Sequence, residues 1–170
     1  RILHRMRRWY TIETYFQKIA MLRERLPEAT LSTDIIVGFP GETEEEFEMT
    51  IDAVKKIRFD LIYSFKYSPR PGTRAADYHG HLSESVKSER LKILLETQGK
   101  IVQEKFQALV GTDQEVLIEG NHHRKANTVA GRTRGNHSVF IKNYTKNAGD
   151  LISVLITKAN QNSLEAVPSS

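Results

Sequence analysis

The stretch from Thr33 to Phe47, TDIIVGFPGETEEEF, decides the fold class of this 170-residue chain. Its first part is short, apolar and β-branched, which predicts a buried parallel strand over residues 31–38. A helix is expected to begin directly afterwards, because Thr43 and Glu46 form a capping-box pattern and the glutamates beside them suit the positive end of a helix dipole. A strand that runs straight into a helix is typical of an α/β fold.

The flanking sequence continues this alternation of helix and strand. Apolar residues recur at helical spacing over residues 11–26 and over residues 83–109, and in the helix after Thr43 they form an inward stripe of Phe47, Ile51, Val54 and Ile57. A second strand is predicted over residues 61–68. Two strands are too few for a complete parallel sheet. Either residues 1–106 are part of a larger barrel, or the rest of their sheet comes from residues outside the chain. The chain also starts at Arg1, inside a predicted helix, and we expect it to be a fragment of a longer protein.

The pattern changes after Gly111, where Gly and Asn turns separate short apolar segments. These turns predict a small all-β barrel over residues 107–170. The five expected strands are Gln114–Glu119, Thr128–Thr133, Ser138–Lys142, Asp150–Lys158 and Ser163–Val167.

Composition limits the chemistry that these residues can perform. The chain contains no cysteine, which excludes disulfides, thiolate nucleophiles and cysteine-ligated clusters within it. Apolar residues make up 39% of the chain, and none of the apolar runs approaches the roughly 20 residues of a membrane span. We expect a soluble, cytoplasmic protein without membrane contact.

Positive charge is concentrated in the second half. The net charge is +4, and the segment between Glu119 and Asp150 holds six basic residues and no acidic one. These residues are Arg124, Lys125, Arg132, Arg134, Lys142 and Lys146. A segment of one sign attracts polyanions such as nucleic acid. Arg132 and Arg134 are two residues apart and are expected on one face of a strand, either as a phosphate-binding pair or as solvated surface charges.

Two loops are candidate sites in the first half, because ligands of α/β folds bind at the carboxyl ends of strands. In the first loop, Gly38 and Gly41 would let the backbone approach a flat ligand closely, and Pro40 fixes the turn. The second, at residues 65–73, presents Arg70 in a rigid loop. A plain tight connection and a solvent-facing connector are the respective alternatives. A cluster of Arg and aromatic residues at 6–11 suits either nucleic acid or packing on the core.

Several motifs together resemble one family. TDIIVGFPGETEEEF at 33–47 and FKYSPRPGTRAA at 65–76 are similar to the MiaB family of radical-SAM methylthiotransferases. The family element M-x-R-x-Y matches Met6, Arg8 and Tyr10, and ERLKILLETQ at 89–98 is similar to the helix after the last barrel strand. The segments EVLIEG, AGRTRGNHSVF and GDLISVLIT resemble a TRAM domain, a small RNA-binding barrel.

The resemblance implies a fold, an activity and its cofactors. Residues 1–106 would be the C-terminal part of a radical-SAM (β/α) barrel, and residues 107–170 would be an OB-like TRAM barrel. Members of the family transfer a methylthio group to C2 of N6-isopentenyladenosine at position 37 of tRNA, using S-adenosylmethionine and two 4Fe–4S clusters. The cysteines that hold the clusters would lie outside this chain, which is therefore expected to contain no catalytic residue, to bind no metal and to be inactive alone. A C-x3-C-x2-C motif is expected upstream. The full-length protein is expected to be a monomer.

The resemblance also assigns roles to individual residues. Val37, Gly38, Phe39 and Gly41 are expected to contact S-adenosylmethionine. Arg8 and Arg70 are expected to face the cavity, toward its carboxylate or an RNA phosphate. The cations Arg124, Lys125, Arg132, Arg134 and Lys142 are expected to bind tRNA.

Three other functions remain open at this point. Two belong to the same family: methylthio transfer to an aspartate of a ribosomal protein, or to threonylcarbamoyladenosine in tRNA. The third is of another class, since the isolated fragment would act as a non-catalytic RNA-binding module.

Overall fold

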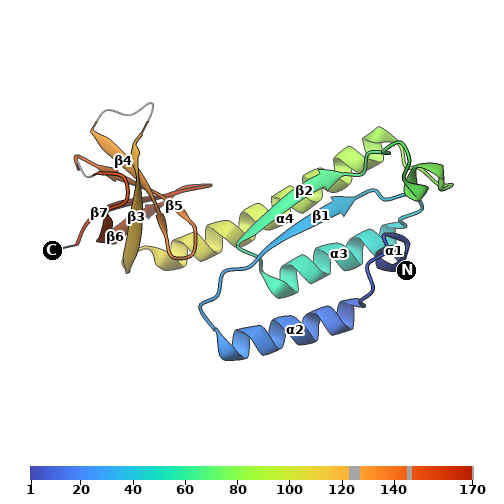
Figure 1. The fold of residues 1–170 in the computed structure, drawn as a ribbon, viewed down its shortest axis with the longest axis horizontal. Coiled ribbons are helices and arrows are strands. Elements are labelled where there is room, and N and C mark those ends of the chain that lie inside the picture. The colour runs from blue at the N-terminus through green and yellow to red at the C-terminus, as the bar shows by residue number, and fades with distance from the viewer. Residues whose placement is uncertain (123–126, 145–146, 170) are drawn as a thin grey trace. The chain divides into compact units, whose positions relative to one another are not determined.

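The computed structural model of the chain describes residues 1–122, 127–144 and 147–169. They form two compact units, Arg1–Ile101 and Val102–Ser170 (Figure 1). The elements of the first unit are α1 (Ile2–Arg5), α2 (Ile12–Arg25), β1 (Ser32–Val37), α3 (Glu44–Ile57), β2 (Leu61–Lys66), the 3-10 helix η1 (Arg74–Asp77) and the first part of α4 (Glu84–Leu109).

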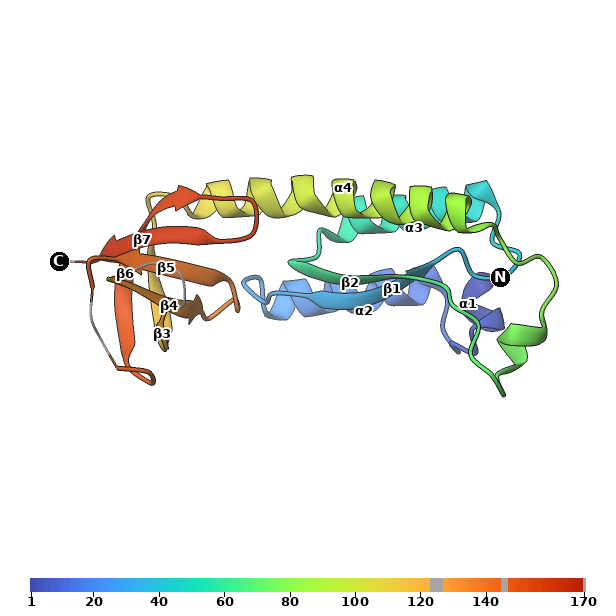
Figure 2. The same ribbon diagram turned by 90° about the horizontal axis from the view of Figure 1, so that it is seen from above.

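Strands β1 and β2 form a two-stranded parallel sheet, in register from Ser32 beside Leu61 to Val37 beside Lys66. Helices α3 and α4 lie on the same side of this sheet (Figure 2). The core between them contains Val37, Phe47, Ile51, Val54, Ile62 and Leu94. The parallel pairing and the helix between the strands agree with the α/β fold predicted from the sequence.

The other face of the sheet carries large apolar side chains that stay exposed. Because side chains alternate along a strand, Ile36 of β1 and Tyr63 and Phe65 of β2 point away from α3 and α4. Their exposed fractions are 43%, 53% and 50%. Ile36 and Phe65 are register partners at the carboxyl ends of the two strands.

The start of α3 has the predicted capping box. The Thr43 hydroxyl accepts a hydrogen bond from the Glu46 backbone N–H, and the Glu46 carboxylate accepts one from the Thr43 N–H. The inward stripe expected for this helix is also confirmed, because Phe47, Ile51 and Val54 are buried.

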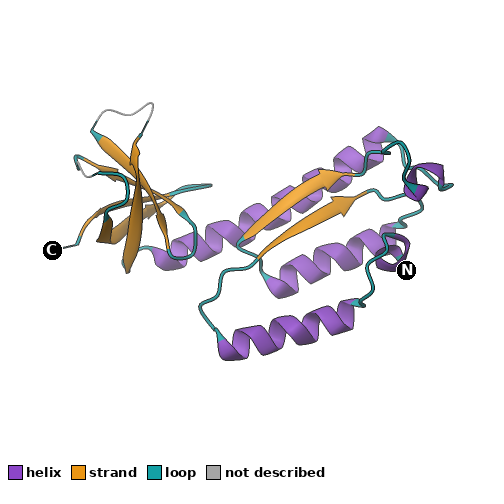
Figure 3. Cartoon of the chain, viewed as in Figure 1, coloured by secondary structure: helices purple, strands orange, loops and turns teal. Residues whose placement is uncertain are grey.

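The second unit is a closed five-stranded barrel with strand order β3-β4-β5-β7-β6 (Figure 3). Its strands are β3 (Asp113–Asn121), β4 (Thr128–Thr133), β5 (Ser138–Lys142), β6 (Leu151–Ala159) and β7 (Leu164–Pro168). Only β5 and β7 pair in parallel. Each strand lies within one or two residues of its predicted position. The core contains Val116, Ile118, Val129, Val139, Ile141, Val154, Ile156 and Leu164, with Phe106 at the end of α4.

One glycine lets two of these strands approach closely. A Cβ on Gly131 of β4 would lie 2.5 Å from the Leu117 carbonyl oxygen and 2.6 Å from a methyl carbon of Val116. Both partners belong to β3, whose register with β4 shifts between Ile118 and Gly120. Across the described part of the chain, none of the helices is long and apolar enough to cross a membrane.

Candidate functional site

The turn that follows β1 is the centre of the first candidate site. Val37, Gly38, Phe39 and Pro40 are buried, and Gly41 is partly buried. Gly38 and Gly41 have φ angles of 74° and 75°, which residues other than glycine rarely adopt. The glycines are therefore required by the backbone path itself, as the sequence predicted for a tight turn.

A buried ion pair holds this turn against α4. One Glu42 carboxylate oxygen accepts hydrogen bonds from the Gly38 N–H at 2.7 Å and from the Arg90 guanidinium at 2.6 Å. Arg90 also donates to the Glu42 carbonyl oxygen at 3.1 Å and to the Glu44 carboxylate at 2.9 Å. Only 4% of the Glu42 side chain and 6% of the Arg90 side chain are exposed.

Burial sets the electrostatics of the pair. Desolvation raises the pKa of the Glu42 carboxyl, whereas the Gly38 N–H and Arg90 both act to lower it. The raised pKa favours a protonated Glu42 carboxyl, whereas the 2.6 Å contact with Arg90 favours the ionised carboxylate. Burial outweighs the two hydrogen-bond partners, because removing a carboxylate from water costs more free energy than these contacts return. Arg90 is thus the group that makes the ionised form tolerable in this position.

Lys87, one helical turn before Arg90, closes the same turn from the side. Its stem lies so close to Gly38 that a Cβ there would overlap the Lys87 Cγ. The Lys87 ammonium donates to the Tyr67 carbonyl oxygen at 3.2 Å and forms an ion pair with Glu84. The pKa of the Glu84 carboxyl is lowered by its hydrogen bonds to Lys87 and to Lys66. Helix α4 therefore fixes the ends of both strands.

Aromatic residues cover the turn from the loop after β2. The Phe39 ring makes edge-on contacts with Tyr67, at 5.2 Å between centroids, and with Tyr78, at 6.1 Å. The Gly41 N–H donates to the Gly80 carbonyl oxygen at 2.7 Å. Val37 and Phe39 are consequently enclosed by the chain itself, and their role in binding S-adenosylmethionine remains a prediction.

The accessible groups beside this turn are Ile36 and Phe65. No role was predicted for them from the sequence, because the predicted site residues were chosen from the VGFPGE motif without regard to which face of the sheet each side chain occupies. Both stand at the carboxyl end of the sheet on its open face. The sequence did contain a signal for Ile36: it lies one residue before the predicted buried Val37, so its side chain must point to the opposite face of the sheet.

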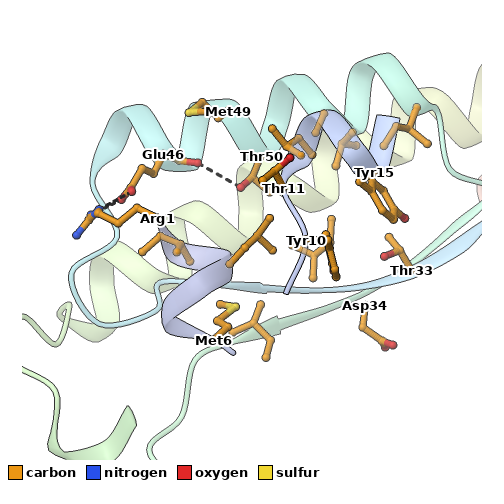
Figure 4. Close-up of a pocket in the computed structure, with 18 of the residues that line it drawn as sticks. Arg1, Met6, Tyr10, Thr11, Tyr15, Thr33, Asp34, Glu46, Met49 and Thr50 are labelled. Atoms are coloured by element: carbon orange, nitrogen blue, oxygen red, sulfur yellow. Dashed lines mark hydrogen bonds and ion pairs between the residues drawn. The ribbon is translucent and has the colours of Figure 1, made fainter. Parts of the chain in front are cut away.

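A separate cavity of about 550 Å³ lies between α1, α2, β1 and α3 (Figure 4). Tyr10 and Tyr15 are stacked there, with centroids 5.8 Å apart, and Arg1 forms an ion pair with Glu46. Asp34 and Met49 also line the cavity. Ile36, near the end of β1, also lines it, but none of the residues predicted from the sequence to contact S-adenosylmethionine does. The structure therefore does not unite the predicted residues in this pocket.

Arg8 and Arg70 are both exposed. Arg8 follows α1 in the connection to α2, and Arg70 lies in the loop after β2, where its carbonyl oxygen accepts hydrogen bonds from the Thr73 N–H and hydroxyl. Their predicted roles toward a carboxylate or a phosphate are not tested by these contacts.

Three of the five cations predicted to bind RNA have carboxylate partners on neighbouring strands. The expectation that Arg132 and Arg134 share one strand is wrong, because β4 ends at Thr133 and Arg134 lies in the turn that follows. Arg132 contacts Glu119 at 3.1 Å, Arg134 contacts Glu115 at 2.6 Å, and Lys142 contacts Glu165 at 2.7 Å. The hydrogen bond from Lys142 lowers the pKa of the Glu165 carboxyl. The charge on this part of the barrel is thus partly compensated. Arg124 and Lys125 lie outside the described residues.

Comparison with known proteins finds a match in each unit. Residues 1–54 match the Radical SAM superfamily, and residues 107–168 match the TRAM domain. The chain therefore carries a radical-SAM segment followed by a TRAM domain.

Its relatives include tRNA-2-methylthio-N(6)-dimethylallyladenosine synthases. The protein of this name from Thermodesulfovibrio yellowstonii is 48% identical over 97% of the chain, and that from Aquifex aeolicus is 44% identical over 97%. The protein from Pelotomaculum thermopropionicum is 44% identical over 94%. These matches confirm the resemblance to methylthiotransferases. The chain spans 36–38% of the length of these three curated relatives.

Proposed function

We propose that the chain is part of a radical-SAM enzyme that adds a methylthio group to C2 of N6-isopentenyladenosine at position 37 of tRNA. The observation that carries this proposal is the identity of 42–48% to synthases of that name, which extends over 94–99% of the chain and across both units. The enzyme would act in the cytoplasm as a monomer, with tRNA as its macromolecular partner.

The proposed fold is the end of a (β/α) barrel over residues 1–106, followed by a TRAM domain over residues 107–170. Two features support the barrel. Its two strands are parallel with the connecting helix on one side, and the face away from α3 and α4 carries exposed apolar side chains. In a closed parallel barrel such a face would be the packed interior.

The open face also fits the nucleoside part of S-adenosylmethionine. Ile36 and Phe65 offer apolar contact at the carboxyl end of the sheet, where barrel enzymes bind their ligands. Gly38, Phe39 and Glu42 would lie behind the contact residues Ile36 and Phe65, and they would hold the turn in shape. Cluster-bound S-adenosylmethionine would supply the radical chemistry. Since the chain has no cysteine, the ligands of both 4Fe–4S clusters would come from other parts of the protein.

The reaction is tested with the full-length, cluster-reconstituted protein and tRNA that carries N6-isopentenyladenosine. Mass spectrometry of the digested tRNA is expected to show the methylthio group on adenosine 37. A methylthio group found instead on a ribosomal protein, or only on threonylcarbamoyladenosine, would contradict the proposed substrate. The 170-residue chain alone is expected to give no product in the same assay.

Binding of tRNA by the chain is expected to depend on charge. Replacing Glu115 or Glu119 with glutamine removes the carboxylate beside Arg134 or Arg132. Each change is expected to raise the affinity for tRNA about two- to fivefold at low salt, because a freed arginine can pair with phosphate. Fluorescence anisotropy over a range of salt concentrations measures both affinity and slope. Glu48→Gln, at an exposed position of α3, is the control and should leave both the affinity and the salt slope unchanged.

A further inference from the structure

The barrel surface has a hollow of about 490 Å³ outside its core, over strands β3, β4 and β5. Gly120, Ala130 and Phe140 are neighbours across these three strands. Phe140 points outward, because Val139 and Ile141 on either side of it are fully buried in the core. Gly120 and Ala130 carry little or no side chain, so the row leaves a depression beside the Phe140 ring.

Aromatic and polar groups surround this depression. The His122 and Phe140 rings meet edge to face, with centroids 4.8 Å apart and planes at 73°. Asn121 and Ser138 also line the hollow and bring an amide and a hydroxyl. A flat ring could therefore contact an aromatic wall while its polar edge finds hydrogen-bond partners.

The charges at the rim favour a neutral ligand over a phosphate. Arg132 is held there by Glu119, at 3.1 Å, and by the Asn136 carbonyl oxygen, at 3.2 Å. Because Glu119 itself lines the hollow, an anion would meet a carboxylate beside the guanidinium. A neutral base meets no such repulsion, and the anchored guanidinium plane can stack on it or donate to it.

We infer that this hollow binds one unstacked base of single-stranded RNA, with Phe140 and His122 as the stacking wall and Gly120 and Ala130 as the floor. The inference rests on the proposed function, since it specifies how the barrel would hold an RNA partner. It differs from the charge-based contacts in one measurable respect. Stacking does not release counterions, so its contribution does not change with salt.

The test uses the 170-residue chain and fluorescein-labelled oligoadenylate, with duplex RNA and inorganic polyphosphate as reference ligands. Ala130→Met fills the floor, and Phe140→Leu removes the aromatic wall. Each variant is expected to bind oligoadenylate about tenfold more weakly, with an unchanged salt slope. Affinity for duplex RNA and polyphosphate should stay as in the parent chain. Arg134→Gln is the matched charge control, and it should lower the salt slope without selecting between single-stranded and duplex RNA.

A measurement on the unaltered chain protects the test against variants that fold poorly. On addition of oligoadenylate, the Ala130 methyl resonance is expected to shift upfield, because a base ring would lie over it. If that resonance does not move at saturation, or if Ala130→Met weakens polyphosphate binding equally, the base site is refuted while RNA binding still stands. If the parent chain binds no RNA, both this inference and the proposed RNA partner fail.

Discussion

Replacing Arg90 with methionine is expected to lower the free energy of unfolding of residues 1–101 by about 3–5 kcal/mol at neutral pH. The change leaves the Glu42 carboxylate buried without its guanidinium partner. It also removes the contact of Arg90 with the Phe47 ring, whose centroid lies 5.2 Å away. Urea unfolding followed by circular dichroism measures the loss, and amide hydrogen exchange assigns it to this unit.

The loss should depend on pH in a defined direction. Burial already raises the pKa of the Glu42 carboxyl, and without Arg90 its folded-state pKa rises further. A raised carboxyl pKa means that the folded state binds the proton more tightly, so its stabilising contribution is present at low pH and is lost as pH rises through the folded pKa. The difference between Arg90→Met and the parent chain should therefore shrink on acidification.

Two further variants identify the cause. The double variant Glu42→Gln/Arg90→Met leaves no buried charge and should recover part of the lost stability. Lys55→Met breaks an exposed ion pair with Asp52 and should cost less than about 1 kcal/mol. An Arg90→Met variant no less stable than Lys55→Met would show that the pair does not hold the turn.

The second large effect is expected at Gly131 in the barrel. Gly131→Ala should destabilise the second unit by about 3 kcal/mol, because the new Cβ meets the Leu117 carbonyl oxygen at 2.5 Å. A backbone atom cannot rotate away as a side chain can. The strands must separate, and hydrogen exchange should accelerate first in β3 and β4.

Gly99→Ala offers the same substitution with the opposite expected sign. Gly99 lies inside α4, where an added Cβ meets nothing within 4 Å. Alanine there should stabilise the helix by about 0.5–1 kcal/mol, because glycine is a poor helix former. Equal thermal unfolding midpoints for the Gly131→Ala and Gly99→Ala variants would contradict the close-approach argument.

Local patterns were sufficient to predict most elements of this fold. The capping box at Thr43 and Glu46 lies within one helical turn, and the barrel strands are bounded by their own Gly and Asn turns. Apolar spacing likewise predicted the buried stripe of α3. Each of these signals acts between residues that are close in sequence.

The contacts that fix the candidate site are of another kind. Glu42 and Arg90 are 48 residues apart, and nothing in either segment indicates that they meet. The acid-free stretch between Glu119 and Asp150 was correctly identified as basic, yet strand pairing brings Glu115 and Glu165 beside its cations. These neighbours depend on which strands pair, and strands distant in sequence, such as β5 and β7, pair in this barrel without a signal in either segment.

The paired cations of the barrel have a kinetic consequence. In the proposed complex with RNA, a carboxylate that competes with phosphate for Arg132, Arg134 or Lys142 would already be in place when the RNA strand begins to leave. Each arginine or lysine would return to its own carboxylate without first recruiting a counterion, which would lower the barrier to release and shorten the residence time of the RNA. The proposed enzyme, which would act on many tRNA molecules in succession, would benefit more from rapid dissociation than from the highest affinity.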